Sequence, residues 1–439
     1  ELTGPGKIDS KNIQILQILP GTANKGFRNS MLLKPELKNV QATEQLNFLL
    51  MIYIPKNTAA GIYLGEITFS AEEQTVKMPI SLRVMDFILP EAGDFGFYIY
   101  GNLYDEKSKF PIPQKGFVKE NLSKYFDFYK TRRLNSVTIY DNTPDLRYVD
   151  GKVSGYFNSF SAIAAAMKKS ELTGKLIIDL RDIGYWANAV AQKIEELNGQ
   201  LPPGDLGITM AQRKNSTSLY SEKAKEIYAE VIRLLLDYAK KEDWPEIRLL
   251  ADEEMGNQTA VKIANYESFM PVIMEICPEL AAAVDNGIGY GRKEATEYGA
   301  RDNVIHRQYN SWTEEALKKA KEDNAEVWSF NYGPQRLSFG FTQQRLNSKG
   351  NHQWADLWDA ANFKWQFTRL SAAGVVSSLE VERIHEGCVD YAACEYLKKL
   401  IKQQEKKIQE FEKSIKILND KNEKNEENIK NKEEEIKTL

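Results

Sequence analysis

Residues 1–90 carry apolar positions in the arrangement that is typical of β-strands. Apolar or alternating runs predict strands at residues 46–54, 62–69 and 76–87, separated by turns that contain glycine or charged residues. No helical period interrupts these runs. Residues 1–90 therefore predict a small antiparallel β-sandwich domain that ends at a linker over residues 87–90. The small number of strands leaves open that the sandwich is N-terminally truncated.

After residue 90 the pattern changes to strands that alternate with amphipathic helices. An order of this kind over residues 91–393 predicts a (β/α)8 TIM barrel. A doubly wound open sheet is the alternative, but the glycines of residues 287–291 lack the spacing and the helix start of a phosphate-binding turn. The eight predicted strands are residues 95–100, 136–140, 175–180, 247–251, 280–284, 304–309, 326–331 and 374–379, and the clearest helices are residues 119–132, 221–241, 261–276, 313–321 and 354–369.

Residues 394–439 follow a third pattern, in which apolar side chains recur on one seven-residue frame within a Lys-, Glu- and Asn-rich background. This is typical of a coiled-coil helix, and we predict self-association into a homo-oligomer through it. Polar residues also occupy the frame, so a single solvated helix is the alternative. The apolar frame residues are Leu397, Ile401, Ile408, Phe411, Ile415, Leu418, Ile429, Ile436 and Leu439, and the polar ones are Gln404, Asn422, Asn425 and Lys432.

Composition narrows the classes of function. The formal net charge of −4 over 439 residues is spread along the chain, so nucleic acid is not an expected partner. The three cysteines and three histidines lack metal-ligand spacing, so we expect no metal and no cofactor. No apolar run reaches the length of about 20 residues that a membrane span needs. The chain starts at Glu1 without a methionine, and we expect an extracytoplasmic protein whose export signal has been removed.

The candidate catalytic residues are Asp252 and Glu253, two adjacent carboxylates that directly follow the apolar run 247–251. Such a run is typical of a buried parallel strand, and a barrel carries its catalytic groups at the carboxyl ends of its strands. A solvated acidic pair is the plain alternative, because acidic residues are frequent in this chain.

The residues at the ends of the other predicted strands are rich in aromatic, amide and carboxylate side chains. Such a mixture suits a sugar, whose hydroxyls need donors and acceptors while its apolar ring face stacks on an aromatic plane. Each tryptophan, taken alone, is more typical of a core position. The predicted substrate-binding residues from these strand ends are Tyr140, Asp179, Tyr309, Asn331 and Tyr332, with Trp328 and Trp354 close by.

The seventh predicted strand ends at Asn331 and Tyr332 without an acid. A retaining glycosidase usually needs a second carboxylate about 5 Å from the first, so this absence favours a substrate-assisted mechanism in which the 2-acetamido oxygen of the sugar attacks its own anomeric carbon. That mechanism needs two neighbouring acids. We assign Glu253 as the general acid and Asp252 as the carboxylate that orients the acetamido group and stabilises positive charge.

Three segments resemble glycoside hydrolase family 123. Residues 54–65 with 82–91 resemble the family's sandwich strands and exit linker, Ala251-Asp252-Glu253 resembles its catalytic pair, and residues 382–391 resemble its last-helix signature. The resemblance implies a sandwich followed by a (β/α)8 barrel, and an exo-acting β-N-acetylgalactosaminidase that acts on a glycan with a terminal 2-acetamido sugar. It also implies a substrate contact for Arg336, which lies in a family-like segment over residues 336–340.

Two other interpretations stay open. The first is a glycosidase on the same barrel that uses Asp179, Asp182 or Asp285 as a nucleophile beside the Asp252 and Glu253 pair. The second is a non-catalytic glycan-binding or assembly protein, in which residues 394–439 join copies of the chain.

Overall fold

The structure is a computed structural model, and it divides the chain into two compact units, Glu1–Tyr391 and Ala392–Leu439. It describes residues 1–19, 31–33, 45–71, 74–93, 95–101, 122–139, 144–197, 200, 204–206, 208, 219–252, 260–276, 282–286, 305–309, 312, 314–322, 326–356, 367–371 and 374–438.

The N-terminal residues form two small antiparallel sheets that share a core. Leu2 and Tyr63 of the first sheet are fully buried against Ile13 and Ile52 of the second, and the rings of Phe48 and Phe69 pair across the sheets at 5.7 Å. Two antiparallel sheets therefore pack against each other in this part of the chain. A separate sandwich domain over residues 1–90 stays a prediction. The first sheet has the order β2-β1-β6-β7, with β1 Leu2–Thr3, β2 Lys7–Ile8, β6 Gly61–Ala71 and β7 Gln74–Val84, and the second has the order β4-β3-β5, with β3 Ile13–Leu19, β4 Met31–Leu33 and β5 Asn47–Ile52.

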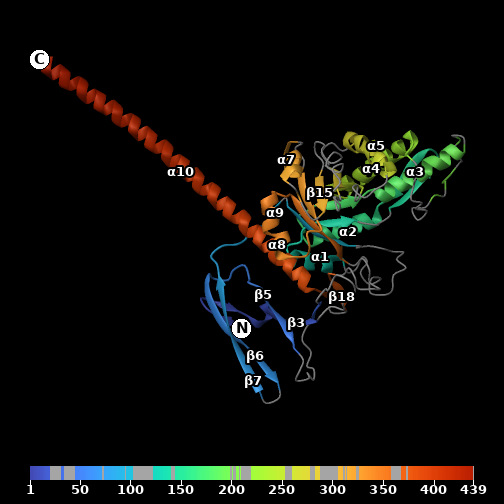
Figure 1. The fold of residues 1–439 in the computed structure, drawn as a ribbon, viewed down its shortest axis with the longest axis horizontal. Helices are drawn as coiled ribbons and strands as arrows, with labels where there is room; N and C mark the ends of the chain where they lie inside the picture. The colour runs from blue at the N-terminus through green and yellow to red at the C-terminus, as the bar shows by residue number, and fades with distance from the viewer. Residues whose placement is uncertain are drawn as a thin grey trace. The chain divides into compact units, whose positions relative to one another are not determined.

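The rest of the unit Glu1–Tyr391 is built on an eight-stranded sheet in the order β8-β17-β16-β15-β14-β13-β12-β9, whose strand pairs are all parallel (Figure 1). Because the strands are parallel, their carboxyl ends lie at one edge of the sheet. The mixed α/β class predicted from the sequence is confirmed. The strands are β8 Gly96–Gly101, β9 Val137–Ile139, β12 Leu176–Asp179, β13 Ile247–Asp252, β14 Ala282–Asn286, β15 Ile305–Tyr309, β16 Glu326–Phe330 and β17 Gly350–Asp356.

The two outermost strands of this order are joined through Asn135, which lies two residues before β9. The backbone amides of Asn135 and Ser136 donate to the carbonyl of Phe97 at 3.0 and 3.1 Å. The buried side chain of Asn135 accepts from the amide of Phe97 and donates to the carbonyl of Phe95, both at 2.8 Å. A side-chain amide carries a carbonyl oxygen that accepts and an NH2 group that donates, so Asn135 pairs with the backbone of β8 as a strand residue would.

One predicted strand is wrong. Residues 374–379 were expected to form the eighth strand of the parallel sheet, but β19 (Gly374–Val376) pairs antiparallel with β18 (Arg369–Ser371) in a separate two-stranded sheet. The eighth parallel strand is β17, and its last residues overlap the helix predicted over residues 354–369. Most residues of β17 are polar, so its sequence lacks the apolar run that is typical of a buried parallel strand. For this reason the strand was not predicted.

Within the described residues, helices and a β-hairpin lie between the strands of the parallel sheet. Helix α4 begins after Ser221, whose hydroxyl accepts from the amide of Ala224 at 3.3 Å, and helices α3, α4 and α5 lie side by side (Figure 1). Their apolar faces form the main core together with the sheet. The helices are α1 Leu122–Thr131, α2 Asn158–Lys169, α3 Arg181–Glu196, α4 Glu222–Lys241, α5 Ala260–Ile276, α7 Glu314–Glu322, α8 Arg336–Phe339 and α9 Phe341–Leu346, and the hairpin is β10 Asp145–Val149 with β11 Lys152–Tyr156.

Helix α10 (Leu379–Thr438) is continuous across both units. It begins after Ser378, whose hydroxyl accepts from the amide of Val381 at 3.3 Å as a helix cap does. In the described parts of the chain, every helix is too short or too polar to span a bilayer.

Candidate active site

The carboxyl edge of the parallel sheet carries the candidate site. Asp179 is the last residue of β12, and Asp252 is the last residue of the adjacent strand β13. The next two strands along the sheet, β14 and β15, end at Asn286 and Tyr309. The sheet topology therefore gathers at one edge the polar residues that are far apart in sequence.

Several predicted residues are placed only in part. The structure gives the backbone of Asp252, Tyr309 and Trp354 within their strands, whereas Glu253 and Tyr140 lie outside the described residues. Leu250 pairs with Ala283 and Asp252 pairs with Val284, so the register shifts just before the end of β13. Irregularities of this type re-aim side chains at the ends of strands. The catalytic roles of Asp252 and Glu253 stay predictions.

Asp179 and Arg181 form a fixed ion pair at this edge. Arg181 Nε lies 2.9 Å from Asp179 Oδ2, and Nη2 lies 2.6 Å from the same oxygen. The backbone amide of Arg181, at the start of α3, also donates to Asp179 Oδ1 at 3.0 Å. Asp179 is 7% exposed, so its charge is balanced within the protein and its oxygens are already hydrogen-bonded. This carboxylate is held in one orientation, and a negative group at a helix N-terminus is favourable.

Gln353 links the ends of β16 and β17. Its side-chain amide donates to Asn331 Oδ1 at 2.9 Å, and its side-chain oxygen accepts from the amide of Gly333 at 3.0 Å. Asn331 has φ 54° and Gly333 has φ 91°, so the chain turns sharply after β16 at residues that tolerate left-handed backbone. Gln353 was not predicted as a site residue, because the sequence pattern did not predict strand β17.

Trp328 is buried against neighbouring strands of the sheet, and its ring is not exposed as a stacking surface for a sugar. Its side chain is 1% exposed, and a Cβ added to Gly350 would lie 2.3 Å from its ring. A Cβ added to Gly96 would lie 3.0 Å from the same ring and 3.1 Å from the hydroxyl of Ser136. The two glycines leave room for the indole, so the structure gives Trp328 a packing role.

Tyr332 packs against a second hydrophobic cluster. It packs against Trp312, which precedes α7, against Ala320 of α7 and against Leu346 of α9. Burial raises the pKa of Tyr332 to about 12, although the nearby backbone of Trp312 opposes this shift. Its neutral hydroxyl is therefore maintained over the physiological range, and substrate binding by this residue stays a prediction.

Arg336 makes a bidentate ion pair with Asp390 on α10. The Nε to Oδ2 distance is 2.6 Å and the Nη2 to Oδ1 distance is 2.8 Å. The hydrogen bonds with Asp390 raise the pKa of Arg336. A Cβ on Gly387, one helical turn before Asp390, would lie 2.6 Å from the carbonyl oxygen of Arg336. Arg336 therefore joins α8 to α10. The predicted contact between Arg336 and a sugar stays a prediction, and it would involve a guanidinium that already pairs with Asp390.

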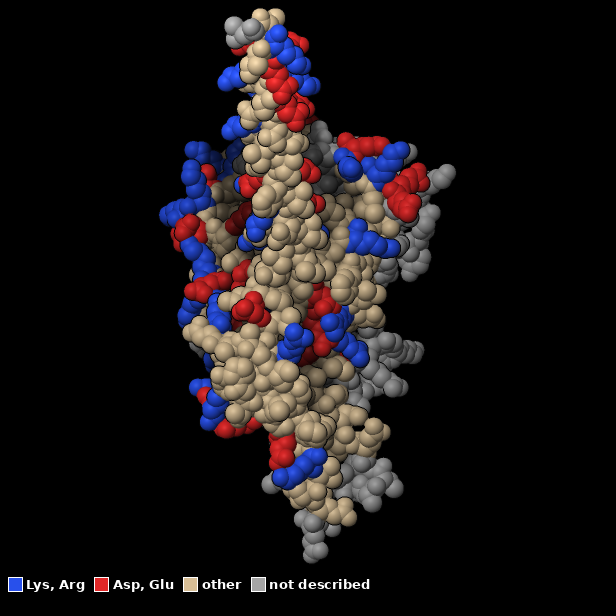
Figure 2. Space-filling view, turned by 90° about the vertical axis from the view of Figure 1, so that its left-hand side faces the viewer, with Lys and Arg blue, Asp and Glu red and all other residues tan. Residues whose placement is uncertain are grey.

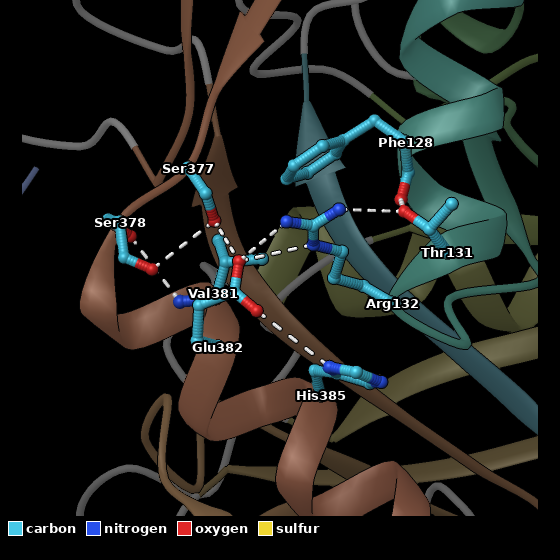
Figure 3. Close-up of polar contacts among 8 residues, drawn as sticks. All are labelled: Phe128, Thr131, Arg132, Ser377, Ser378, Val381, Glu382 and His385. Atoms are coloured by element: carbon cyan, nitrogen blue, oxygen red, sulfur yellow. Dashed lines mark hydrogen bonds and ion pairs between the residues drawn. The ribbon is translucent and has the colours of Figure 1, made fainter. Parts of the chain in front are cut away.

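The start of α10 is held by a buried polar network around Glu382 (Figure 3). Arg132 Nε and Nη2 both donate to Glu382 Oε1, at 3.1 and 3.0 Å, and the hydroxyl of Ser377 donates to the same oxygen at 2.7 Å. His385 Nδ1 lies 3.7 Å from Glu382 Oε2. Burial raises the pKa of Glu382, but the contact with His385, the charge of Arg132 and the bonds from Ser377 and Arg132 outweigh burial and lower it overall. Within residues 382–391, Glu382 and Asp390 are thus both paired with an arginine from outside α10.

Within the described residues, no three His, Cys, Asp or Glu side chains come together as a metal site. Lysine, arginine, aspartate and glutamate are interspersed on the face shown in Figure 2, where no large patch has a single sign. The polar groups described at the strand ends include the Asp179 carboxylate and the side-chain amides of Asn331 and Gln353.

The comparisons with solved structures bear on this arrangement. The fold is similar to that of a family 123 glycoside hydrolase. That enzyme comes from Clostridium perfringens, was studied for glycolipid glycan hydrolysis, and aligns with a TM-score of 0.64 at 13% identity over 92% of this chain and 79% of its own. The resemblance to family 123 stated from the sequence is confirmed as a likeness of fold.

Two further structures are similar over shorter or looser alignments. A family 39 glycoside hydrolase from Bacteroides cellulosilyticus has a TM-score of 0.43 at 12% identity over 87% of this chain and 79% of its own. An endo-β-1,4-mannanase from Thermotoga petrophila has a TM-score of 0.41 at 13% identity over 69% of this chain and 78% of its own. No protein-family profile matches the chain, and no curated protein matches it in sequence.

Proposed function

We propose that this protein is a glycoside hydrolase that releases a terminal β-linked N-acetylgalactosamine by substrate-assisted catalysis. In this mechanism Glu253 protonates the leaving oxygen, and the acetamido oxygen of the sugar forms the bond to the anomeric carbon. Asp252 orients the acetamido N–H and stabilises the positive charge of the cyclic intermediate. Water then opens that ring, with Glu253 accepting its proton.

One observation carries the proposal. Asp252 is the last residue of β13, an inner strand of a parallel sheet whose fold is similar to that of a family 123 glycoside hydrolase. The adjacent acid, Glu253, follows directly in the sequence. Two acids at the carboxyl end of an inner strand are well placed for catalysis, because ligands of parallel α/β sheets bind at that edge.

We propose further that the eight parallel strands close into a (β/α)8 barrel. The hydrogen bonds between Phe97 and Asn135 support closure, because they join the two ends of the strand order. The packing of Trp328 supports it too, because its ring lies against Gly350 of β17 and Gly96 of β8, and the site of a Gly96 Cβ also touches Ser136 beside β9. A closed barrel gives the candidate residues one common mouth.

The geometry of Asp179 disfavours it as the nucleophile of a two-carboxylate glycosidase. A nucleophilic carboxylate needs a free oxygen directed at the anomeric carbon, whereas Asp179 accepts hydrogen bonds from Arg181 on both of its oxygens. We expect Asp179 to fix the turn from β12 into α3 through its bonds with Arg181. Asp179→Asn then lowers the free energy of unfolding, and we expect kcat per folded molecule to be unchanged.

Release of 4-nitrophenol from the β-N-acetylgalactosaminide and the β-N-acetylglucosaminide tests the proposed function. Wild type, Asp252→Asn and Glu253→Gln are compared, with Glu254→Gln as the matched control. We expect Asp252→Asn to lose about 10²–10³ in kcat, because orientation and charge stabilisation are removed. Glu253→Gln keeps part of its activity on this activated leaving group and loses about 10²–10⁴ on an alkyl aglycone. Wild-type activity that survives in Asp252→Asn would refute the assignment.

A thiazoline that mimics the cyclised acetamido sugar separates the two glycosidase mechanisms. An enzyme that uses the acetamido group binds it tightly as an intermediate analogue. An enzyme with a carboxylate nucleophile has no reason to prefer it to a simple sugar. Absence of competitive inhibition in an active preparation would exclude the substrate-assisted mechanism and leave the glycosidase activity itself intact.

A further inference from the structure

We propose that residues 397–439 pair with a second copy of this chain as a parallel, in-register, two-stranded coiled coil. Helix α10 is unbroken through Thr438, and its apolar frame residues from Leu397 to Ile436 are each 55–71% exposed. Burial of such a stripe against a second helix removes a long strip of apolar surface from water. The inference does not depend on the proposed glycosidase activity.

The residue types on the frame favour two helices. With Ile401 at position a of the heptad, every other a position after it holds isoleucine except Asn422, and the d positions include Leu397 and Leu418. Isoleucine at a with leucine at d packs best in a parallel dimer. The five isoleucines at a are Ile401, Ile408, Ile415, Ile429 and Ile436.

Asn422 determines the register of the proposed pair. A single asparagine at an a position can satisfy its amide against its own counterpart only when the two helices are parallel and unshifted. A shift by one heptad would set Asn422 against Ile415 or Ile429 of the second copy and leave a buried amide without a partner. The polar residues Gln404, Asn425 and Lys432 at d lower the affinity without changing this preference.

The charges that flank the frame select the parallel direction. In a parallel pair each g position faces the e position five residues later on the other helix, which brings Lys407 to Glu412 and Lys421 to Glu426. No such pair along the helix combines two like charges. An antiparallel pair would instead set e against e, where Glu405, Glu412, Glu426 and Glu433 repel one another. Figure 2 shows both signs of charge along the C-terminal end of this helix.

Sedimentation equilibrium of the full chain tests the pairing with a matched pair of substitutions. Ile415 at position a and Ile417 at position c are 57% and 56% exposed in the single chain. We expect wild type and Ile417→Lys to be dimers at micromolar concentration, and Ile415→Lys to be a monomer with an unchanged circular dichroism spectrum. A monomeric wild type, a trimer or tetramer, or equal effects of the two substitutions would overturn the proposal.

A charge exchange tests the direction and the register. Lys407→Glu and Glu412→Lys each create two like-charge contacts in the symmetric dimer, so we expect each alone to bind itself on the order of tenfold more weakly. An equimolar mixture forms a heterodimer in which both contacts join opposite charges again, with wild-type affinity. Failure of the mixture to recover affinity would refute a parallel in-register coil, because an antiparallel pair does not bring these two positions together.

Discussion

Removal of the Glu382 carboxylate tests the energetic role of the network that holds the start of α10. Glu382→Gln keeps the shape and one oxygen acceptor for Arg132 while it removes the negative charge. The guanidinium of Arg132 is then left in a buried position, in contact with the ring of Phe128 at 4.3 Å and with the hydroxyl of Thr131 at 2.8 Å. Neither neighbour neutralises its charge.

The magnitude follows from burial. Glu382 is 6% exposed and Arg132 is 8% exposed, so water cannot replace the lost partner without opening the packing. Loss of one partner of a buried pair costs about 3–5 kcal/mol in the free energy of unfolding. We expect about 3 kcal/mol for Glu382→Gln, because the amide retains an acceptor, and about 4 kcal/mol for Arg132→Met, because a buried carboxylate is left.

Urea unfolding followed by circular dichroism at neutral pH measures these changes. The double variant Arg132→Met with Glu382→Gln removes both charges, so we expect it to cost at least about 2 kcal/mol less than the sum of the single changes. Glu196→Gln is the control, because Lys193 and Glu196 form an exposed pair at 2.8 Å whose loss costs less than about 1 kcal/mol. A Glu382→Gln effect as small as that of the control, or an additive double variant, would refute the argument.

The pKa of Glu382 predicts a pH dependence with a defined sign. The pKa lies below its usual value of 4.5 in the folded protein, so the folded state binds the proton more weakly than the unfolded chain does. The contribution of Glu382 to stability is therefore fully present above about pH 4.5 and is lost as the pH falls through the lowered pKa. We expect the urea midpoint of wild type to fall more steeply toward pH 3 than that of Glu382→Gln, and parallel curves would contradict this assignment.

Three further changes test the sheet and its surroundings. Gly350→Ala places a Cβ 2.3–2.5 Å from Trp328, and we expect urea unfolding to show a loss of at least about 2 kcal/mol; a neutral effect would mean that the indole is free to move. Asn135→Ala leaves the Phe97 amide and the Phe95 carbonyl without their side-chain partner, and we expect a loss of about 2–4 kcal/mol by the same assay. Because the pKa of Tyr332 is raised to about 12, its contribution is present below pH 10 and lost as the pH rises toward 12; thermal unfolding of Tyr332→Phe should lack this part of the alkaline loss, and curves equal to those of wild type would contradict it.

The sequence by itself determined the elements whose apolar period is strong. Seven of the eight predicted strand segments lie in the parallel sheet, and the helices predicted over residues 221–241 and 261–276 are confirmed to within a residue. Such elements can be predicted from a short stretch of sequence. A parallel strand that is buried on both faces has a continuous apolar run, and a helix that is buried on one face has apolar residues at a period of about 3.6. The same reasoning placed Asp179 and Asp252 at the ends of adjacent strands.

The partners of the side chains were decided only by the tertiary structure. Strand β17 has no apolar run, and it is a strand because β16 and β8 pair with it on either side. Trp328 was a candidate for sugar stacking, but it is buried because two glycines from neighbouring strands leave space for its ring. Arg336 meets Asp390 across 54 residues, and Arg132 meets Glu382 across 250 residues. Contacts at such separations depend on the packing of whole elements, which a local pattern of residues does not encode.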